Sequence, residues 1–115
     1  MKKLSIVILN WNGAAMLREF LPSVIAHSKG EGIEVCVADN ASTDNSLEVM
    51  RQEFPDVRLI LLDKNYGFAD GYNIAIGRVK TPYVVLLNTD VEVTKSWLLP
   101  MLSYLEDHSK VVAVQ

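Results

Sequence analysis

The sequence predicts an α/β fold with a mostly parallel sheet, in which strands and helices alternate along the chain. Four short apolar runs rich in Val, Ile and Leu are separated by segments of helical periodicity, which is typical of strands joined by crossover helices. The runs are apolar at nearly every position, as expected for strands covered on both faces. They are Leu4 to Leu9, Ile33 to Ala38, Val57 to Leu62 and Tyr83 to Leu87.

A first helix is expected between the first two strands, because apolar residues there repeat at the spacing of one helical face. Pro22 interrupts this pattern, and it is predicted to kink the helix or to remove a hydrogen bond to Arg18. The repeating apolar residues are Leu17, Phe20, Leu21, Val24 and Ile25.

Three further helices are predicted from the same periodicity. Ser42, Thr43 and Asp44 are candidate N-caps of the second helix. Gly71 and Gly77 lower the helix-forming tendency of the third predicted helix. The inward positions are Leu47, Met50 and Phe54 in the second helix, Tyr72, Ala75, Ile76 and Val79 in the third, and Leu98, Met101, Leu102 and Leu105 in the fourth.

The last residues read as the start of a fifth strand, Val111 to Val114. An apolar edge strand without a charge or a proline invites association with another chain. We therefore expect that the chain is the front part of a longer, truncated fold. The alternative is that this strand forms an edge through which two copies associate as a homodimer.

Composition and charge favour a single soluble domain. The chain has 115 residues, of which 50% are hydrophobic and 22% charged, and this balance is normal for a globular protein. A net charge of −3 provides no basic field for a nucleic acid backbone. Cys36 is the only cysteine, so no intrachain disulfide forms and a cytoplasmic location is expected. Attachment to a membrane surface through another part of a longer protein stays open.

In an open parallel sheet, ligands bind beyond the carboxyl ends of the strands, so the polar residues there are considered together. No GxGxxG or GxxxxGK motif follows the first strand, which argues against a dinucleotide fingerprint and a phosphate loop. A response-regulator receiver is disfavoured because the first strand ends in asparagines. The four strand ends are 10–13, 39–41, 63–67 and 88–90.

Two carboxylates at separate strand ends suggest how a nucleotide would be held. Asp90 can ligate a hard divalent cation that keeps open positions for substrate phosphates. Asp39 can accept a hydrogen bond from the N3 imide of a uracil or thymine base, or from a ribose hydroxyl. Asp63 is a third acid at a strand end and is left unassigned.

Four stretches in order carry a resemblance to a known family. They are VILNWNG at 7–13, VADNASTDNS at 37–46, NYGFADGYN at 65–73 and LLNTDVEV at 86–93. The chain resembles the N-terminal part of a family 2 glycosyltransferase with the GT-A fold, and in particular its rhamnosyltransferase-like branch. The resemblance implies a three-layer sandwich in which residues 1–115 form the donor-binding part, with the acceptor-binding half absent.

The resemblance also implies an inverting, metal-dependent transfer of a sugar from a UDP-type or dTDP-type donor to a glycan or lipid-linked acceptor. Asp90 would bind Mg²⁺ or Mn²⁺, as in a DxD-like motif, and Asn88 would orient the ribose or a water on the metal. The remaining nucleotide-binding residues would be Asn10, Trp11, Asn12, Asp39, Asn65, Gly67 and Asn73. No residue matches the family's general base, so the catalytic residue is unassigned.

Two other functions are weighed against this one. The second hypothesis is that the chain is a nucleotide-sugar-binding module without turnover, since no acceptor half and no general base are recognised in it. A sugar nucleotidyltransferase would need a glycine-rich, basic phosphate loop after the first strand, and NWNGAAM lacks one. Trp11 is equally well explained as a packed aromatic and as a surface on which a base stacks.

Overall fold

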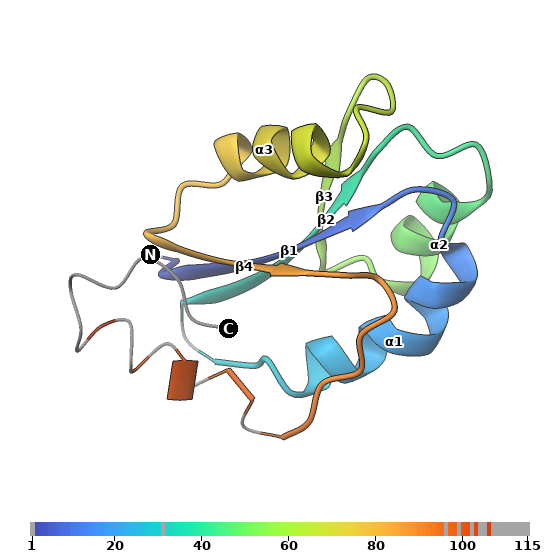
Figure 1. The fold of residues 1–115 in the computed structure, drawn as a ribbon. Helices are drawn as coiled ribbons and strands as arrows, with labels where there is room; N and C mark the ends of the chain where they lie inside the picture. The colour runs from blue at the N-terminus through green and yellow to red at the C-terminus, as the bar shows by residue number, and fades with distance from the viewer. Residues whose placement is uncertain are drawn as a thin grey trace.

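The computed structural model describes residues 2–30, 32–95, 97, 98, 100, 101, 103 and 106, and the regular elements within these residues form one α/β body (Figure 1). The strands are β1 (Leu4–Asn10), β2 (Ile33–Asp39), β3 (Arg58–Leu61) and β4 (Tyr83–Leu87). The helices are α1 (Ala14–Ala26), α2 (Ser46–Glu53) and α3 (Phe68–Arg78).

The sheet has the order β3-β2-β1-β4, and every neighbouring pair is parallel, which confirms the predicted α/β class. β1 and β2 are paired along their whole length, up to Asn10 opposite Asp39. β4 lies on the other side of β1, and its pairing ends at Leu87 opposite Ile8. β2 and β3 are therefore added on one side of β1 and β4 on the other, so the strand order reverses between β1 and β4. Open α/β sheets bind ligands at such a switch point.

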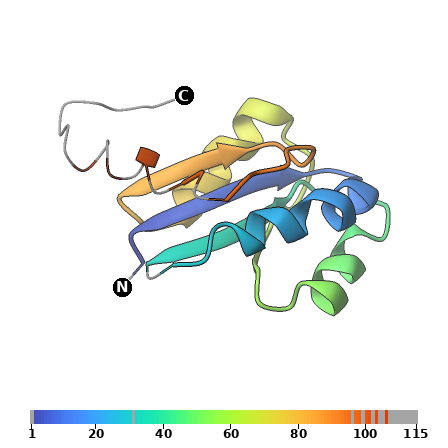
Figure 2. The same cartoon turned by 90° about the horizontal axis from the view of Figure 1, so that it is seen from below.

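The molecule has three layers, because α1 and α2 cover one face of the sheet and α3 covers the other (Figures 1 and 2). Alternate strand residues supply two cores, as the pleat requires. On the α1 side the core includes Ile6, Ile8, Leu17, Leu21 and Met50. On the α3 side it includes Val7, Cys36, Ile60, Tyr72 and Ala75.

Cys36 is a core side chain, as its sequence context suggests, and it is completely buried. Burial raises the pKa of its thiol to about 12, so it stays neutral at physiological pH. Within the described residues, we find no helix with the length and apolarity that crossing a membrane requires.

The segment after β4 folds back over α1. The backbone N–H of Val93 donates to Ser23 Oγ at 3.4 Å, and the indole N–H of Trp97 donates to Ser28 Oγ at 3.0 Å. Leu98 is buried in the core on the α1 side. Residues 100, 101, 103 and 106 have helical geometry, in agreement with the expected fourth helix. Leu102, Leu105 and the expected fifth strand at 111–114 lie outside the described residues.

The structure adds detail to two sequence expectations about the helices. α1 continues through Pro22, whose side chain is exposed and so does not disturb the buried stripe. α2 buries Met50, as expected, together with Val49, which was not expected, while the half-buried Phe54 packs against the same core and Leu47 is half-buried. The N-cap position of α2 is Asn45, after the three candidate caps, and it makes no side-chain cap bond.

A methyl group at Gly71 is predicted to be unfavourable, because the side chains of Leu9 and Asn40 lie close to this position and would have to shift. A Cβ at Gly71 would lie 2.9 Å from Leu9 Cδ2 and 3.1 Å from Asn40 Nδ2. Gly71→Ala should therefore destabilise the fold by about 1–3 kcal/mol. Gly77, in the same helix, has no atom within 4 Å of its Cβ position. Gly77→Ala should stabilise by about 0.5–1 kcal/mol.

Urea unfolding of the two variants checks this prediction. Both carry the same substitution in one helix, so the change in helix propensity is similar and the difference mainly reports the contacts with Leu9 and Asn40. Equal free energies of unfolding for the two variants would show that α3 does not press on Leu9 and Asn40.

Candidate functional site

A cleft of about 500 Å³ lies at the carboxyl ends of the strands. It brings together five residues that the sequence predicted for nucleotide and metal binding: Trp11, Asn65, Gly67, Asn88 and Asp90. They come from the segments that follow β1, β3 and β4. The cleft also includes residues to which the sequence analysis gave no role: Leu9, Met16, Asn40, Phe68 and Thr89.

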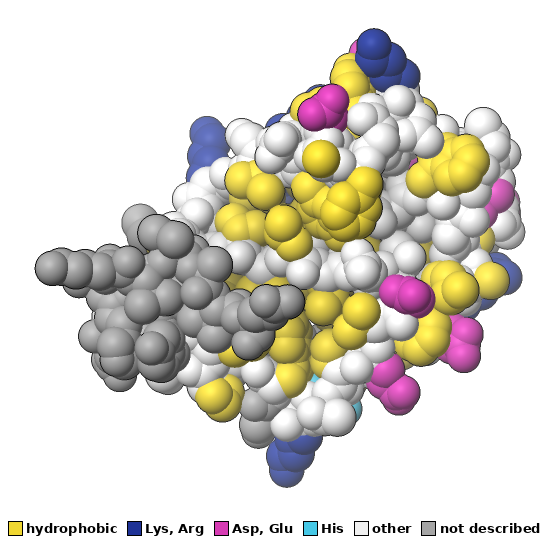
Figure 3. Space-filling model, viewed as in Figure 1, with side chains coloured by type: hydrophobic (Ala, Val, Ile, Leu, Met, Phe, Trp, Pro, Cys, Tyr) yellow, Lys and Arg dark blue, Asp and Glu magenta, His cyan; other side chains and the backbone are white. Residues whose placement is uncertain are grey.

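Two exposed aromatic side chains line this cleft. Trp11 is 53% exposed and Phe68 is 67% exposed, which is unusual for large apolar rings in a domain of this size. Leu86 on β4 is also half exposed. Figure 3 shows hydrophobic side chains gathered beneath α3 and over β4 on this side of the molecule. The exposure of Trp11 favours a stacking surface over a packed aromatic.

Asp39 and Asn10 lie beneath the loops, with 3% and 0% of their surface exposed, and neither lines the cleft. Asn10 Nδ2 donates to Asp39 Oδ1 at 3.0 Å. Ser42 donates twice to the same carboxylate, from its backbone N–H to Oδ2 at 2.9 Å and from its hydroxyl to Oδ1 at 2.7 Å. Both carboxylate oxygens are thus engaged by the chain itself. Direct contact between Asp39 and a base stays a prediction, and it would require Ser42 to share or release a bond.

Asn10 also carries an unsatisfied acceptor. Its Oδ1 is the one buried side-chain oxygen or nitrogen without a hydrogen bond in the part of the chain that the structure describes. A Cβ at Gly13 would lie 2.5 Å from this oxygen, so only glycine fits at that position without moving Asn10. Buried carbonyl oxygens of this kind normally accept from a water or a ligand.

Asn12 ties the loop after β1 to the loop after β2, and it does not line the cleft. Its Oδ1 accepts from the backbone N–H groups of Thr43 at 2.7 Å and Asp44 at 3.1 Å. Asn12 adopts a left-handed conformation with φ 52°, which asparagine tolerates better than most residues. Its predicted contact with the nucleoside stays a prediction, and the structure gives it a role in joining the two loops.

Asn40 is a site residue to which the sequence analysis assigned no role. Its Nδ2 donates to the Gly67 carbonyl at 3.0 Å, and its Oδ1 accepts from the Tyr66 N–H at 2.9 Å. Asn65 Oδ1 accepts from the Gly67 N–H at 2.8 Å, within the same turn. Asn40 thus fixes the wall of the cleft formed by Asn65 and Gly67. Its place directly after Asp39 in VADN was the available signal.

The strand-end acid left unassigned, Asp63, accepts a hydrogen bond from the Tyr66 hydroxyl. This bond holds the pKa of Asp63 below its ordinary value. Lys64 Nζ lies 5.1 Å from the centre of the Tyr66 ring, within cation–π range. Asn73 is exposed on α3 and is not among the cleft residues, so its predicted part in the pocket wall stays a prediction.

The comparison with protein families decides the classification. The family described as "Glycosyl transferase family 2" matches residues 5–115. The chain belongs to glycosyl transferase family 2. The family 2 resemblance noted in the four motifs is thereby confirmed.

The family 2 chain is similar to parts of longer proteins. It is 32% identical over 96 residues to a teichoic acid poly(glycerol phosphate) polymerase of Staphylococcus epidermidis, covering 80% of this chain and 13% of that protein. It is 30% identical over 115 residues to an uncharacterized glycosyltransferase of Nostoc sp., covering 97% of this chain and 35% of that protein. The chain thus spans about a third or less of the length of these relatives.

Solved glycosyltransferases share the fold. S. aureus TarS 1–349 superposes with a TM-score of 0.78 at 22% identity, over 93% of this chain and 33% of that one. The mannosyltransferase PcManGT of Pyrobaculum calidifontis, solved with GDP-Man and Mn²⁺, gives 0.78 at 24% identity, over 90% of this chain and 32% of that one. These likenesses confirm the GT-A fold of the family 2 chain.

The cleft residues fit a divalent cation only as part of a larger ligand set. Among the described residues, no group of three or more His, Cys, Asp or Glu side chains is placed to cage a metal. Asp90 is an exposed carboxylate on the cleft, and Asn88 is a neutral amide beside it. Mg²⁺ is commonly bound through one or two carboxylates together with substrate phosphates and water. The donor set therefore suits a cation that arrives with a diphosphate.

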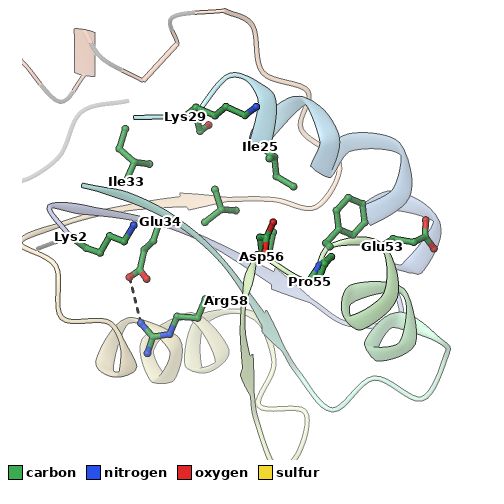
Figure 4. Close-up of a pocket in the computed structure, with 13 residues that line it drawn as sticks. Lys2, Ile25, Lys29, Ile33, Glu34, Glu53, Pro55, Asp56 and Arg58 are labelled. Atoms are coloured by element: carbon green, nitrogen blue, oxygen red, sulfur yellow. Dashed lines mark hydrogen bonds and ion pairs between the residues drawn. The ribbon is translucent and has the colours of Figure 1, made fainter. Parts of the chain in front are cut away.

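A second cavity, of about 480 Å³, lies at the opposite ends of the strands, between α1, the end of α2 and the edge of β2 (Figure 4). Arg58 Nη1 and Glu34 Oε2 form an ion pair across it at 3.5 Å. It includes none of the sequence-predicted site residues. The cleft at the carboxyl ends is therefore the candidate functional site.

Proposed function

We propose that this chain is the donor-binding part of a metal-dependent glycosyltransferase that uses a nucleoside-diphosphate sugar and transfers the sugar with inversion. The observation that carries the proposal is the single cleft at the β1–β4 switch point, which combines exposed Trp11 with Asn88 and Asp90. An aromatic surface and an isolated carboxylate complement the two ends of a nucleoside diphosphate.

The diphosphate end is assigned to Asp90 and Asn88. Asp90 offers an exposed, anionic oxygen ligand, and Asn88 offers a neutral carbonyl two residues earlier on the same loop. Bound there, Mg²⁺ or Mn²⁺ would supply positive charge that stabilises the departing nucleoside diphosphate. Asn88 orients the ribose or a water.

The nucleoside end is assigned to the loops after β1 and β2. Trp11 stacks on the base, and Asn10 and Asp39 lie directly beneath these loops. Asn10 is completely buried, so its Oδ1 would reach a ligand only through a bridging water. Asn12 holds the two loops together, while Asn65, Gly67 and Asn73 shape the wall formed by the β3–α3 turn and α3.

The substrate class is supported by neighbours of the same fold. S. aureus TarS has been solved with UDP-GlcNAc, and PcManGT with GDP-Man and Mn²⁺. We assign a UDP-type or dTDP-type donor to this chain, in which Asp39 would accept from the uracil or thymine imide once Ser42 releases one of its bonds. A glycan or lipid-linked acceptor and a cytoplasmic location, with peripheral membrane attachment in a longer protein, complete the proposal.

The general base remains unassigned. Glu106 Oε1 lies 2.7 Å from Lys3 Nζ, at the amino end of β1 and thus far from the cleft. Asp90 is the only acidic residue among those that line the cleft in the described part of the chain. This observation favours a second candidate function, nucleotide-sugar binding without turnover. A sugar-transfer assay separates the two, because transfer by the 115-residue chain alone would exclude the binding module.

Calorimetry with UDP and dTDP, each with and without Mn²⁺, tests the proposal. We expect binding of at least one nucleotide that strengthens about tenfold or more when Mn²⁺ is present, because the cation joins the diphosphate to Asp90. The absence of heat at millimolar nucleotide, with or without Mn²⁺, would refute donor binding.

A further inference from the structure

The hydroxyl of Tyr72 sits where β1 and β4 separate. Regular pairing of these strands ends at Ile8 opposite Leu87. At that end the Tyr72 hydroxyl accepts a hydrogen bond from the Leu9 N–H at 3.3 Å and donates one to the Leu87 carbonyl at 2.7 Å. A side chain of α3 thus stands between a donor of one strand and an acceptor of the other.

The surroundings of Tyr72 hold its hydroxyl in place. The residue is 4% exposed and belongs to the core between the sheet and α3. Burial raises its pKa above the ordinary value, so the hydroxyl keeps the proton that it donates to Leu87. The ring also meets Phe68 edge-on, with 5.0 Å between ring centres.

Both bonded backbone groups adjoin the candidate site. Leu87 directly precedes Asn88, the first residue of the segment that carries Asp90, and Leu9 itself lines the cleft. Without the hydroxyl, these groups would either remain unpaired or close toward each other. The first outcome is costly in a buried setting, and the second would move the segment that bears Asp90.

We infer that Tyr72 is a positioning residue that holds the ends of β1 and β4 apart and thereby places Asp90 relative to Trp11. This inference rests on the proposed function only for its consequence in nucleotide binding. The separation of β1 and β4 at Leu9 and Leu87, called the β1–β4 fork, is a property of the free protein.

Tyr72→Phe removes the hydroxyl and keeps the ring that supports Phe68. Tyr83→Phe is the matched control, because Tyr83 is the first residue of β4 and lies at the opposite end of that strand from Leu87. Amide hydrogen exchange should show faster exchange of the Leu9 N–H in Tyr72→Phe and no change in Tyr83→Phe. NMR should show shifted amide resonances for residues 88–90 in Tyr72→Phe only.

The functional readout is the ratio of UDP affinities with and without Mn²⁺. Tyr72→Phe should reduce this ratio by about fivefold, since the net contribution of one typical hydrogen bond corresponds to about this factor. Tyr83→Phe, which keeps the Tyr72 hydroxyl and every residue that lines the cleft, should leave the ratio unchanged. Loss of folding stability alone would not alter the ratio, because binding is measured on the folded fraction.

The inference would be overturned if the Leu9 N–H exchanged at the wild-type rate in Tyr72→Phe. It would also be overturned if both the amide resonances of residues 88–90 and the ratio of UDP affinities stayed as in the wild type. If wild-type protein bound no UDP, the proposed donor binding would fail instead. Faster Leu9 exchange with shifted 88–90 resonances would then still support the fork.

Discussion

Asp90→Asn is expected to abolish most of the gain in UDP affinity that Mn²⁺ provides, about ten- to a hundredfold. The substitution preserves shape and a carbonyl oxygen but removes the only carboxylate that lines the cleft among the described residues. UDP binding without Mn²⁺ should change little, because the base and ribose contacts are untouched. Calorimetric titrations at fixed Mn²⁺ concentration measure both quantities.

Asp56→Asn is the matched control, since it removes the same charge from an exposed position between α2 and β3. It should leave UDP affinity unchanged with and without Mn²⁺. Equal effects of the two substitutions would mean that Asp90 acts only through net charge. An Asp90→Asn protein with the full Mn²⁺ effect would remove Asp90 from the metal site.

Asp39→Asn should produce the largest loss of stability among the site variants. The Asp39 carboxylate accepts three hydrogen bonds from Asn10 and Ser42 and is almost completely buried. An amide there turns an NH₂ group toward donors, so at least one bond is replaced by a repulsive contact. We expect a cost of about 2–4 kcal/mol, since hydrogen bonds to buried charged groups have this magnitude.

Thermal unfolding measures this cost, which corresponds to a decrease in Tm on the order of 10 °C for a domain of this size. Asp56→Asn again serves as the control and should leave Tm unchanged. An Asp39→Asn protein as stable as the wild type would show that the loop after β2 does not depend on this carboxylate. Asp39 would then be free to bind a base directly.

The fold was largely readable from the sequence because the strands are continuous apolar runs. β4 was predicted with its observed bounds, and β1 and β2 extend only one residue further, to Asn10 and Asp39. Those added residues are polar, so hydropathy alone did not include them. They pair with each other through the backbone register, and the Asn10 amide donates to the Asp39 carboxylate.

The helices were harder because local rules compete with tertiary packing. Proline was expected to disturb α1, yet Pro22 faces solvent and the buried stripe of the helix is intact. In α2 the predicted residues Met50 and Phe54 contact the core, but Val49, which was not predicted, is buried as well. Periodicity in a helix of 8 residues does not define a face uniquely.

The candidate site was predicted as a set of strand ends, and the structure collects Trp11, Asn88 and Asp90 in one cleft. The sequence did not reveal that Asn12 joins two loops, that Asn40 fixes the wall at Gly67, or that Tyr72 reaches the β1–β4 fork. Each of these contacts joins a side chain to the backbone of a distant segment. Such contacts leave no periodic pattern in the sequence.

A crystal structure of this chain with UDP and Mn²⁺ tests the central claim most directly. We predict that Mn²⁺ is held by the Asp90 carboxylate together with the diphosphate of UDP, and that the uracil stacks on Trp11. Nucleotide bound in any other cavity, or Mn²⁺ coordinated without Asp90, would contradict the claim.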